Sequence, residues 1–369
     1  MPRPLQPDRQ LLGVTLALCF IGAVMVFSAS ALTARELFHN GYIFLIRQLF
    51  AAAIGLAGMF WLTNTDYRSL RQPRVIFTGL AVSFVLLVAV FFLDRSHHTH
   101  RWFRIWAFSF QPSELAKLAL IIFLAWFIEL RRSPQNFGVN DFFRTIAPAL
   151  GVVSLMAALI VKEPDMGTAF MILVIAIVML FVAGLRWEYL AGAAVTALPV
   201  IYLLIVRVPY RLARWNAFLH PDVDPQGHGF QLLQSLIAVG SGGFSGVGLM
   251  ESRQKLFFLP EAHTDFIFSV ICEELGFIGA VVVLALFAIY GWRGFCAAMR
   301  APDDFGRFLA LGVTTMVVGQ AFINLSVVLG LMPTKGIPLP FISYGGSSLI
   351  AMLLATGVLL NISQHADET

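Results

Sequence analysis

The chain has 369 residues, of which 58% are apolar and only 12% are charged, and its mean hydropathy is +0.80. Such a composition excludes a soluble globular domain and indicates a polytopic membrane protein. The formal net charge is only +4, so the sequence pI near 9.1 indicates basic cytoplasmic loops rather than affinity for nucleic acid. The three cysteines, Cys19, Cys272 and Cys296, are far apart and match neither a disulfide framework nor a metal-binding spacing.

Ten apolar runs are long enough to cross a hydrocarbon core of roughly 30 Å. We therefore predict an all-α polytopic membrane protein with about ten transmembrane helices in a single domain, residues 1–369. The N-terminus and the loops after even-numbered spans hold 12 Lys and Arg residues, whereas the short loops on the other face hold six. The positive-inside rule then predicts that both termini are cytoplasmic. The predicted spans are residues 11–32, 43–63, 75–93, 113–130, 145–161, 167–185, 189–206, 265–292, 308–331 and 345–362.

The outward loop before the fourth span combines histidines with a basic and aromatic pair. His97, His98 and His100 lack the spacing of a structural zinc site, and no cysteine or acid completes such a set. Solvated histidines are the simpler interpretation. Arg101 next to Trp102 is different, because an arginine beside an interfacial aromatic ring can bind a lipid phosphate.

The fourth span opens with a capping residue and two opposite charges. We expect Ser113 to cap the helix, and Glu114 and Lys117 lie three residues apart on one face. A charge inside a membrane costs about 2.5–3.5 kcal/mol on insertion scales, so two retained charges require a tight pair or a polar cavity. Two interpretations of this pair therefore remain, a structural ion pair and part of a functional polar cavity.

A short break carrying Glu163 and Asp165 separates the fifth and sixth spans. Asp165 is well placed to cap the sixth helix. The two acids can also supply oxygen ligands to a divalent cation, although two carboxylates alone do not define such a site. Capping is the favoured interpretation.

One large extracytoplasmic loop, residues 207–264, connects the seventh and eighth spans. Its apolar stretch 232–239 and its glycine-rich stretch 240–248 predict an amphipathic or re-entrant piece folded against the bundle. A phosphate-binding loop is disfavoured, because no strand precedes the glycines and no Gly-Lys-Ser follows them.

Basic residues gather at the start of that loop, where Arg207, Arg211 and Arg214 precede Trp215. Anchoring to anionic headgroups explains such a patch, and it competes with a specific pyrophosphate site.

The loop ends in an acidic stretch that contains Glu261 and His263 and leads through Asp265 into the eighth span. Ser269 and Glu273 follow Asp265 at +4 and +8, which puts Glu273 roughly 12 Å further along a helix. Such a line of acids can be the proton path of a transporter. Alternatively, Asp265 is a general base above structural acids, or it only caps the helix.

Seven separated motifs occur in order over essentially the whole chain. They are Arg101-Trp102, Gln111 to Lys117, Asp165 to Thr168, Tyr210-Arg211 with Arg214, Ser241 to Gly243, Leu259 to Phe266 and Pro338 to Ser347. Together they resemble the SEDS family (shape, elongation, division and sporulation). The residues around Lys255 and the run from Pro333 to Pro338 resemble the division type more than the elongation type. One departure is that His98-Thr-His100 stand before Arg101 where the family has small residues.

The resemblance implies a peptidoglycan glycosyltransferase that polymerises lipid II at the outer face of the cytoplasmic (inner) membrane, for septal wall synthesis. The growing chain, linked to undecaprenyl pyrophosphate, would be transferred with inversion to the 4-hydroxyl of an incoming lipid II, and undecaprenyl pyrophosphate would be the leaving group. A class B penicillin-binding protein is the implied transpeptidase partner, beside other divisome or elongasome membrane proteins. A divalent cation, Mg²⁺ or Mn²⁺, is expected, and no organic cofactor.

Asp265 matches the essential aspartate of the family, so the resemblance implies that it is the catalytic residue. It would act as the base or as a ligand of the cation, for which Asp165 is the other candidate. Departure of the pyrophosphate requires positive charge. The candidates for binding it are Arg101, Lys117, Arg211, Arg214 and Lys255, and supporting or structural roles are expected for Trp102, Glu114, Asp165, Glu261, His263 and Ser343.

Two alternatives stay open, a lipid II flippase and an elongation-type polymerase. A flippase needs a polar path to both faces of the membrane, whereas the charged motifs here gather on the outward side. This asymmetry favours the enzyme. A purely structural scaffold would leave the buried charges unexplained.

Overall fold

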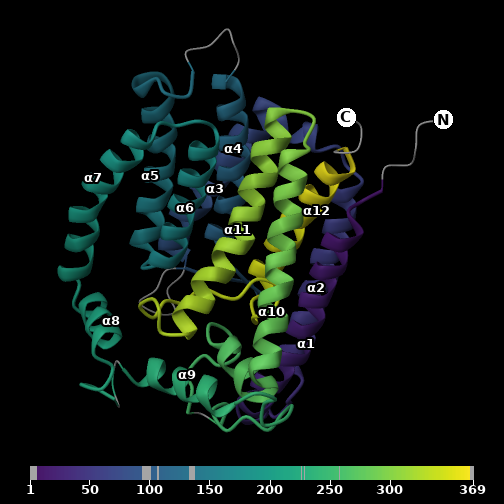
Figure 1. The fold of residues 1–369 in the computed structure, drawn as a ribbon, viewed down its shortest axis with the longest axis vertical. Helices are drawn as coiled ribbons and strands as arrows, with labels where there is room; N and C mark the ends of the chain where they lie inside the picture. Colours follow the sequence, from purple (N-terminus) through teal and green to yellow (C-terminus); the bar gives the residue numbers. More distant parts are fainter. Residues whose placement is uncertain are drawn as a thin grey trace.

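Apolar helices make up nearly all of the computed structural model, which describes residues 6–93, 101–105, 108–132, 138–225, 227, 229–256 and 258–365 (Figure 1). The described part also holds two short strands, which pair antiparallel with Phe103 opposite Phe110. The predicted all-α class is therefore correct except for this pair, in which aromatic side chains favour extended backbone. The elements are α1 (Arg9–Phe38), α2 (Ile43–Thr63), η1 (Tyr67–Arg71), α3 (Pro73–Leu93), β1 (Phe103–Ile105), β2 (Phe108–Phe110), α4 (Pro112–Arg132), η2 (Phe142–Ile146), α5 (Ala147–Lys162), α6 (Met166–Val182), α7 (Trp187–Val206), α8 (Pro209–Leu219), α9 (Phe230–Ser241), α10 (Ile267–Met299), α11 (Asp304–Val328) and α12 (Gly346–His365).

Eight helical segments in the described chain are long and apolar enough to cross a membrane. They are α1, α2, α3, η2 with α5, α7, α10, α11 and α12. Two predicted spans fold as helices but do not reach this standard. The helix α6 has only 17 residues, and α4 carries charged residues at both ends, among them Glu114 and Lys117 near its start.

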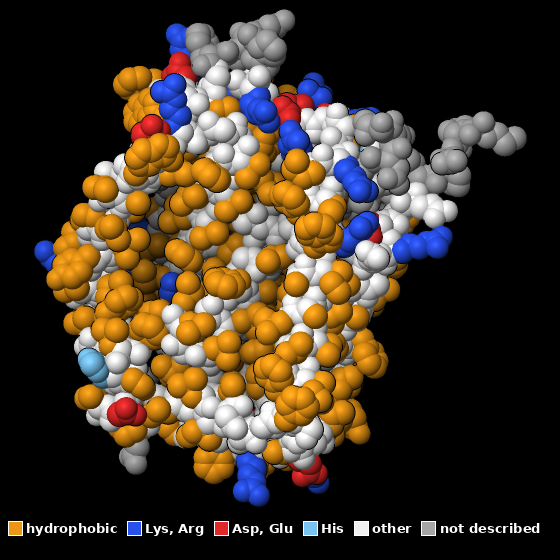
Figure 2. All heavy atoms as spheres, in the orientation of Figure 1, with side chains coloured by type: hydrophobic (Ala, Val, Ile, Leu, Met, Phe, Trp, Pro, Cys, Tyr) orange, Lys and Arg blue, Asp and Glu red, His pale blue; other side chains and the backbone are white. Residues whose placement is uncertain are grey.

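Charged side chains gather at the two ends of the molecule, and apolar side chains cover the middle of the visible face (Figure 2). This distribution suits a protein whose waist lies in hydrocarbon and whose ends meet water. Many large apolar side chains of the membrane-length helices are exposed, for example Phe20, Phe92 and Trp61. In a soluble protein such exposure would promote aggregation, whereas in a membrane it is the expected lipid contact.

The start of α1 and the end of α12 lie together at one end of the bundle. The backbone N–H of Asp8 donates to Ser363 Oγ at 3.2 Å, and the Asp8 carboxylate pairs with Arg293 of α10. The same carboxylate accepts from the backbone N–H of Gln10 and so caps α1. The predicted long outward loop, which contains α8 and α9, lies at the opposite end (Figure 1).

The helix α10 bends at Gly276, whose φ of 64° and ψ of −162° are not helical. The bend leaves the carbonyls of Glu273 and Glu274 without partners inside the helix. They accept instead from the backbone N–H groups of Val247 and Gly248, both at 3.0 Å. The glycine-rich stretch therefore folds back against the bundle, as predicted, and α9 packs on α10 beside it.

The helix α7 stands apart from the other helices (Figure 1). None of its residues is buried, and it packs mainly against α8, which follows it. Apolar side chains all round a helix without protein neighbours are stable only in lipid. The helix α8 therefore carries Arg211 and Arg214 beside the least buried helix of the fold.

Candidate functional site

Asp265 lies in the loop that leads into α10, two residues before the helix begins. The loop between α11 and α12 wraps around it. The carbonyl of Thr264 accepts from Ser343 Oγ at 2.6 Å, and the carbonyl of His263 accepts from the N–H of Tyr344 at 3.0 Å. From α11, Asn324 Nδ2 donates to the carbonyl of Asp265 at 2.8 Å. Three successive carbonyls are thus held by other parts of the chain.

The carboxylate of Asp265, in contrast, accepts no hydrogen bond from the described residues, and the residue is half-buried. Burial raises the pKa of Asp265 to about 7. The negative charges of Glu261 and Asp165 add to this shift. The positive charges of Arg101 and Arg214 oppose it. An acid that is half ionised near neutral pH is suited to accept a proton.

The break between α5 and α6 contributes the second acid. Asp165 caps α6, because its Oδ1 accepts from the N–H of Thr168 at 3.0 Å. Its Oδ2 accepts from Thr168 Oγ1 at 2.8 Å and from Gln111 Nε2 at 2.9 Å. Capping, the favoured interpretation of Asp165, is confirmed. Arg101 anchors the strand pair to the same break, since its guanidinium donates to the carbonyls of Glu163 and Pro164.

Glu163 differs from its neighbours because it is fully buried and neither carboxyl oxygen has a partner among the described residues. Burial, and then the charge of Asp165, raises the pKa of Glu163 to about 9, against the influence of Arg101. Glu163 is therefore neutral at physiological pH and adds no negative charge to the site.

Glu114 and Lys117 form a buried ion pair on α4, with 3.0 Å between Nζ and Oε1. Lys117 Nζ also donates to Gln320 Oε1 of α11 at 2.7 Å, while Glu114 Oε2 has no partner in the described chain. Ser113 does not cap α4: the helix begins at Pro112, and the Ser113 hydroxyl is buried without a partner there. Proline at the helix start fixes φ by itself, so α4 begins without the predicted cap.

The two arginines of α8 have different surroundings. Arg211 donates to Tyr210 Oη and to the carbonyl of Leu204, both at 3.1 Å, which ties α8 to the end of α7. Arg214 is exposed, and its charge reaches Asp265. Arg214 is therefore the freer of the two for binding an anion.

Lys255 is buried and pairs with Glu274 of α10 at 2.9 Å. Ser28 donates to the same carboxylate at 2.6 Å. Next to it, Glu273 accepts from Ser252 Oγ and from the N–H of Arg253. Both acids of α10 thus hold the outward loop down, so Lys255 would have to leave its partner before it could bind a phosphate.

The supporting residues predicted near Asp265 lie around it. His263 contacts the rings of Phe44 and Tyr344, with centroids 5.0 and 5.8 Å away. Burial lowers the pKa of His263, which favours the neutral imidazole. Glu261 is exposed and accepts from Thr264 Oγ1 at 2.8 Å.

The structure describes only one part of the predicted loop before α4. Trp102 is half-buried beside Arg101 at the strand pair. His97, His98 and His100 lie outside the described residues, so their interpretation stays a prediction.

The described side chains include no group of three or more His, Cys, Asp and Glu placed to hold a metal ion. Asp165 already accepts three hydrogen bonds, Glu163 is neutral and Glu114 is paired with Lys117, which leaves Asp265 as the candidate ligand among the acids described above. A cation there would need oxygens from the substrate phosphates, in the manner of Mg²⁺.

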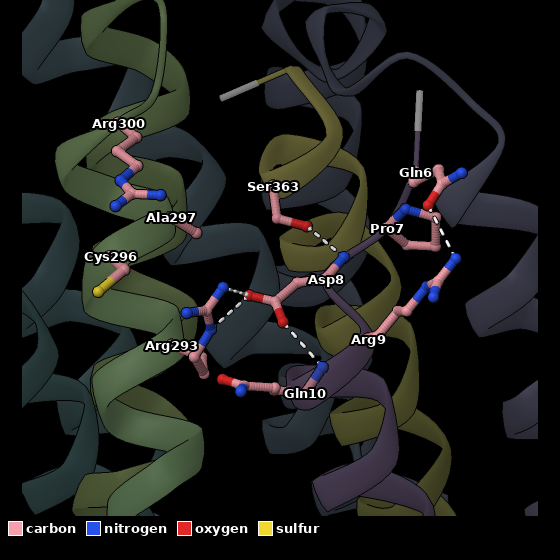
Figure 3. Close-up of a pocket in the computed structure, with 10 residues that line it drawn as sticks. All are labelled: Gln6, Pro7, Asp8, Arg9, Gln10, Arg293, Cys296, Ala297, Arg300 and Ser363. Carbon is pink, nitrogen blue, oxygen red and sulfur yellow. Dashed lines mark hydrogen bonds and ion pairs between the residues drawn. The ribbon is translucent and has the colours of Figure 1, made fainter. Parts of the chain in front are cut away.

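A cavity of about 320 Å³ lies at the other end of the bundle (Figure 3). Figure 3 shows Asp8 between Arg293 of α10 and the start of α1, with Arg300 at the end of α10 on the same side as Arg293. None of the predicted site residues lines it. The cavity is therefore separate from the site at Asp265, which lies at the opposite end of α10.

A family model described as "cell cycle protein", FtsW/RodA/SpoVE, matches residues 9–368. The chain belongs to this family. The resemblance to SEDS proteins is thereby confirmed. A Geobacter metallireducens protein named "Probable peptidoglycan glycosyltransferase FtsW" is 45% identical, over 98% of this chain and 96% of the relative. Stage V sporulation protein E of Bacillus subtilis is 44% identical, over 98% of each chain.

Two solved structures share the fold. A chain from a peptidoglycan synthase complex, described as coordinating polymerization and crosslinking, matches with a TM-score of 0.78 and 31% identity. The match covers 99% of this chain and 100% of that chain. The rod shape determining protein RodA of Thermus thermophilus matches with a TM-score of 0.71 and 29% identity, over 98% of each chain.

Sequence reasoning missed three residues that organise the site. Asn324 and Gln320 lie one turn apart in an apolar helix, where two buried amides are a signal that can be read from sequence. Lys335 belongs to the run from Pro333 to Pro338 but was not a candidate site residue. It is half-buried, contacts the ring of Phe170 at 4.9 Å, and the negative charge of Asp165 acts on it.

Proposed function

We propose that this protein is a peptidoglycan glycosyltransferase that polymerises lipid II. Relatives named peptidoglycan glycosyltransferase FtsW match nearly the whole chain at 43–46% identity, which supports the activity. The observation that carries the site is Asp265, whose backbone is fixed while its carboxylate is free. The carboxylate lies where the charges of Arg101 and Arg214 reach it.

In the proposed reaction, Asp265 accepts the proton of the acceptor 4-hydroxyl as that oxygen bonds to the anomeric carbon of the donor. The bond from that carbon to undecaprenyl pyrophosphate breaks, and the configuration inverts. The leaving pyrophosphate is stabilised by Arg101, Arg211 and Arg214, since charge that develops in a transition state is stabilised by preplaced cations. Lys117 and Lys255 stay candidates, although each is engaged in a buried ion pair.

A divalent cation, Mg²⁺ or Mn²⁺, belongs to the proposal as a neutraliser of the pyrophosphate. As the alternative to its role as the base, Asp265 would hold this cation together with oxygens of the substrate.

The proposed topology has ten membrane crossings, both termini in the cytoplasm and residues 207–264 outside. The contact between Asp8 and Ser363 supports an even number of crossings, because it puts the start of α1 beside the end of α12. Asp265 then faces the periplasm or cell exterior, where lipid-linked wall precursors are polymerised. The protein is accordingly proposed to reside in the inner membrane.

We propose a class B penicillin-binding protein as the transpeptidase partner, within a larger set of divisome or elongasome membrane proteins. The similar solved chain from a synthase complex that couples polymerization to crosslinking supports this partner. Identities of 43–46% to proteins named FtsW, against 29–31% to the solved structures, favour the division type over the elongation type. The sporulation relative, at 44%, is equally similar.

The test of the site compares the purified protein with Asp265→Asn, with lipid II as substrate and glycan strands as the readout. We expect the variant to fold and to bind lipid II but to make no polymer. Glu251→Gln, an exposed acid of the same outward loop, is the matched control and should keep full activity. Normal polymerisation by Asp265→Asn would contradict the role of Asp265.

A lipid II flippase is the second candidate, because acids enter the membrane along α10. Glu273 and Glu274 are both engaged in anchoring the outward loop, which disfavours a proton path. Lipid II supplied in the outer leaflet separates the two functions. The proposed enzyme makes polymer from it without any flipping step, whereas a flippase makes none.

A further inference from the structure

Two buried amide side chains on α11 link the loop of Asp265 to the rest of the bundle. Asn324 Nδ2 donates to the carbonyl of Asp265 at 2.8 Å and to the carbonyl of Ile337 at 2.7 Å. Both hydrogens of one amide are therefore used on two segments that are distant in sequence. Both acceptors are carbonyl oxygens, so only the amide nitrogen can occupy this position.

One turn earlier, Gln320 continues the connection. Its Nε2 donates to the carbonyl of Pro338 at 2.9 Å, and its Oε1 accepts from Lys117 at 2.7 Å. Residues four apart lie on one face of a helix, so the two amides bind adjacent carbonyls of the same loop. The chain of contacts runs from the Glu114 and Lys117 pair to the backbone of Asp265.

Asn324 is 2% exposed, and its Oδ1 is buried without a partner in the described chain. An unsatisfied buried acceptor is unfavourable in a protein interior, so an apolar residue of similar size would avoid that cost here. What Asn324 adds over such a residue is the pair of bonds that it donates.

We propose that Asn324 is a positioning residue for Asp265. It sets the distance between the Asp265 backbone and the loop that carries Ser343, and Gln320 fixes that loop to the bundle. This inference rests on the proposed catalytic role of Asp265. It predicts that loss of Asn324 slows the chemical step and leaves substrate binding intact.

The experiment measures polymerisation kinetics and thermal unfolding of purified Asn324→Leu. A catalytic group displaced by about 1 Å can lose on the order of 10²-fold in rate, so we expect kcat to fall by that order. KM for lipid II should stay within about twofold, because binding groups are not removed. Asn324→Ser keeps one donor and should show a smaller loss.

Asn361→Leu on α12 is the matched control. Asn361 is also buried and also makes two backbone contacts, donating to the carbonyl of Thr63 and accepting from the N–H of Tyr67, both within 3.0 Å. It lies toward the end of α12, near the termini of the bundle. We expect a similar decrease in unfolding temperature with unchanged kcat.

The inference is overturned if Asn324→Leu keeps the wild-type kcat, or if Asn361→Leu lowers kcat equally at equal loss of stability. If Asn324→Leu does not fold, Asn324→Ser decides: an intermediate loss of kcat supports the role and a wild-type kcat overturns it. Asp265→Asn in the same assay separates the two proposals. Polymer from that variant removes the catalytic role itself, whereas an inactive Asp265→Asn beside a fully active Asn324→Leu removes only the positioning role.

Discussion

At the scale of single residues, the site combines a fixed backbone with a free, partly buried acid. The carbonyls around Asp265 are bound by Ser343, Tyr344 and Asn324, while the carboxylate stays unbound in the described structure. Burial and neighbouring acids raise the pKa of Asp265 to about 7. An aspartate in water would be fully ionised at pH 7. The surroundings of Asp265 therefore determine how far its carboxyl group is ionised at that pH.

The pKa of Asp265 predicts a pH dependence of polymerisation. A base acts in its ionised form, so kcat/KM should rise as pH increases through about 7 and level off above it. Glu261→Gln removes a negative charge that raises this pKa, so the midpoint should move to lower pH, by less than about one unit. A profile that is flat from about pH 5.5 to 8.5, or a midpoint that Glu261→Gln leaves in place, would contradict a base at Asp265.

The buried pair of Glu114 and Lys117 predicts a difference between stability and activity. Either single charge reversal should destabilise the protein by about 3–5 kcal/mol, because a buried charge loses its partner. The double reversal should recover much of this loss of stability. Polymerisation should nevertheless stay below about a tenth of the wild-type rate, because misplacement of a reacting group lowers the rate by at least that much. The reason is that Gln320, which accepts from Lys117, would meet a carboxylate instead.

Reversal of the exposed pair of Arg132 and Asp304 is the control for that experiment. Its side chains are 34% and 37% exposed, so stability should change by less than about 1 kcal/mol. Full polymerisation by the double reversal of Glu114 and Lys117 would show that the pair only stabilises the bundle.

At the scale of elements, most helices were predictable, because long apolar runs in a membrane must be helical. The predicted span 43–63 coincides with α2, and the predicted start of the eighth span differs from α10 by two residues. The start of α4 was not predicted correctly, because the helix begins at Pro112 and Ser113 is already inside it. The helix α8 was not predicted either, because 11 residues of mixed polarity give only a weak periodic signal.

The bend in α10 makes a prediction for Gly276. A Cβ at this position would lie 2.3 Å from the backbone N of Gly246, and the positive φ is strained for any other residue. Gly276→Ala should therefore lower the unfolding free energy by about 1–3 kcal/mol or more. Thermal unfolding in detergent measures it. Gly192→Ala in α7, where no atom lies within 4 Å, is the control and should have no adverse effect.

At the scale of the whole molecule, the site is assembled from segments far apart in sequence. Four segments contribute to it: the strand pair with Arg101, the start of α6 with Asp165, α8 with Arg214, and the loop before α10 with Asp265. The resemblance identified all four by motif, but residue types alone could not bring them together. The contacts of Asn324 and Gln320 were hidden for the same reason, because an amide in an apolar helix does not reveal which carbonyl it binds.

The sparse set of metal ligands predicts how the whole protein responds to chelation. Without a group of three acidic or histidine ligands among the described residues, a cation would depend on the substrate for its other oxygens. EDTA should therefore stop polymerisation and leave the unfolding temperature of the lipid-free protein unchanged. Mg²⁺ or Mn²⁺ should restore the activity. A lower unfolding temperature after chelation would reveal a resident structural metal instead.

The three bound carbonyls before α10 also bear on how small molecules would recognise this protein. A compound that contacts the Asp265 carboxylate meets a backbone that is already ordered by α11 and the loop before α12. Little conformational entropy is then lost from the protein when the compound binds. Affinity at this site should consequently depend on the contacts of the compound itself, and rigid compounds should gain more from each contact than flexible ones.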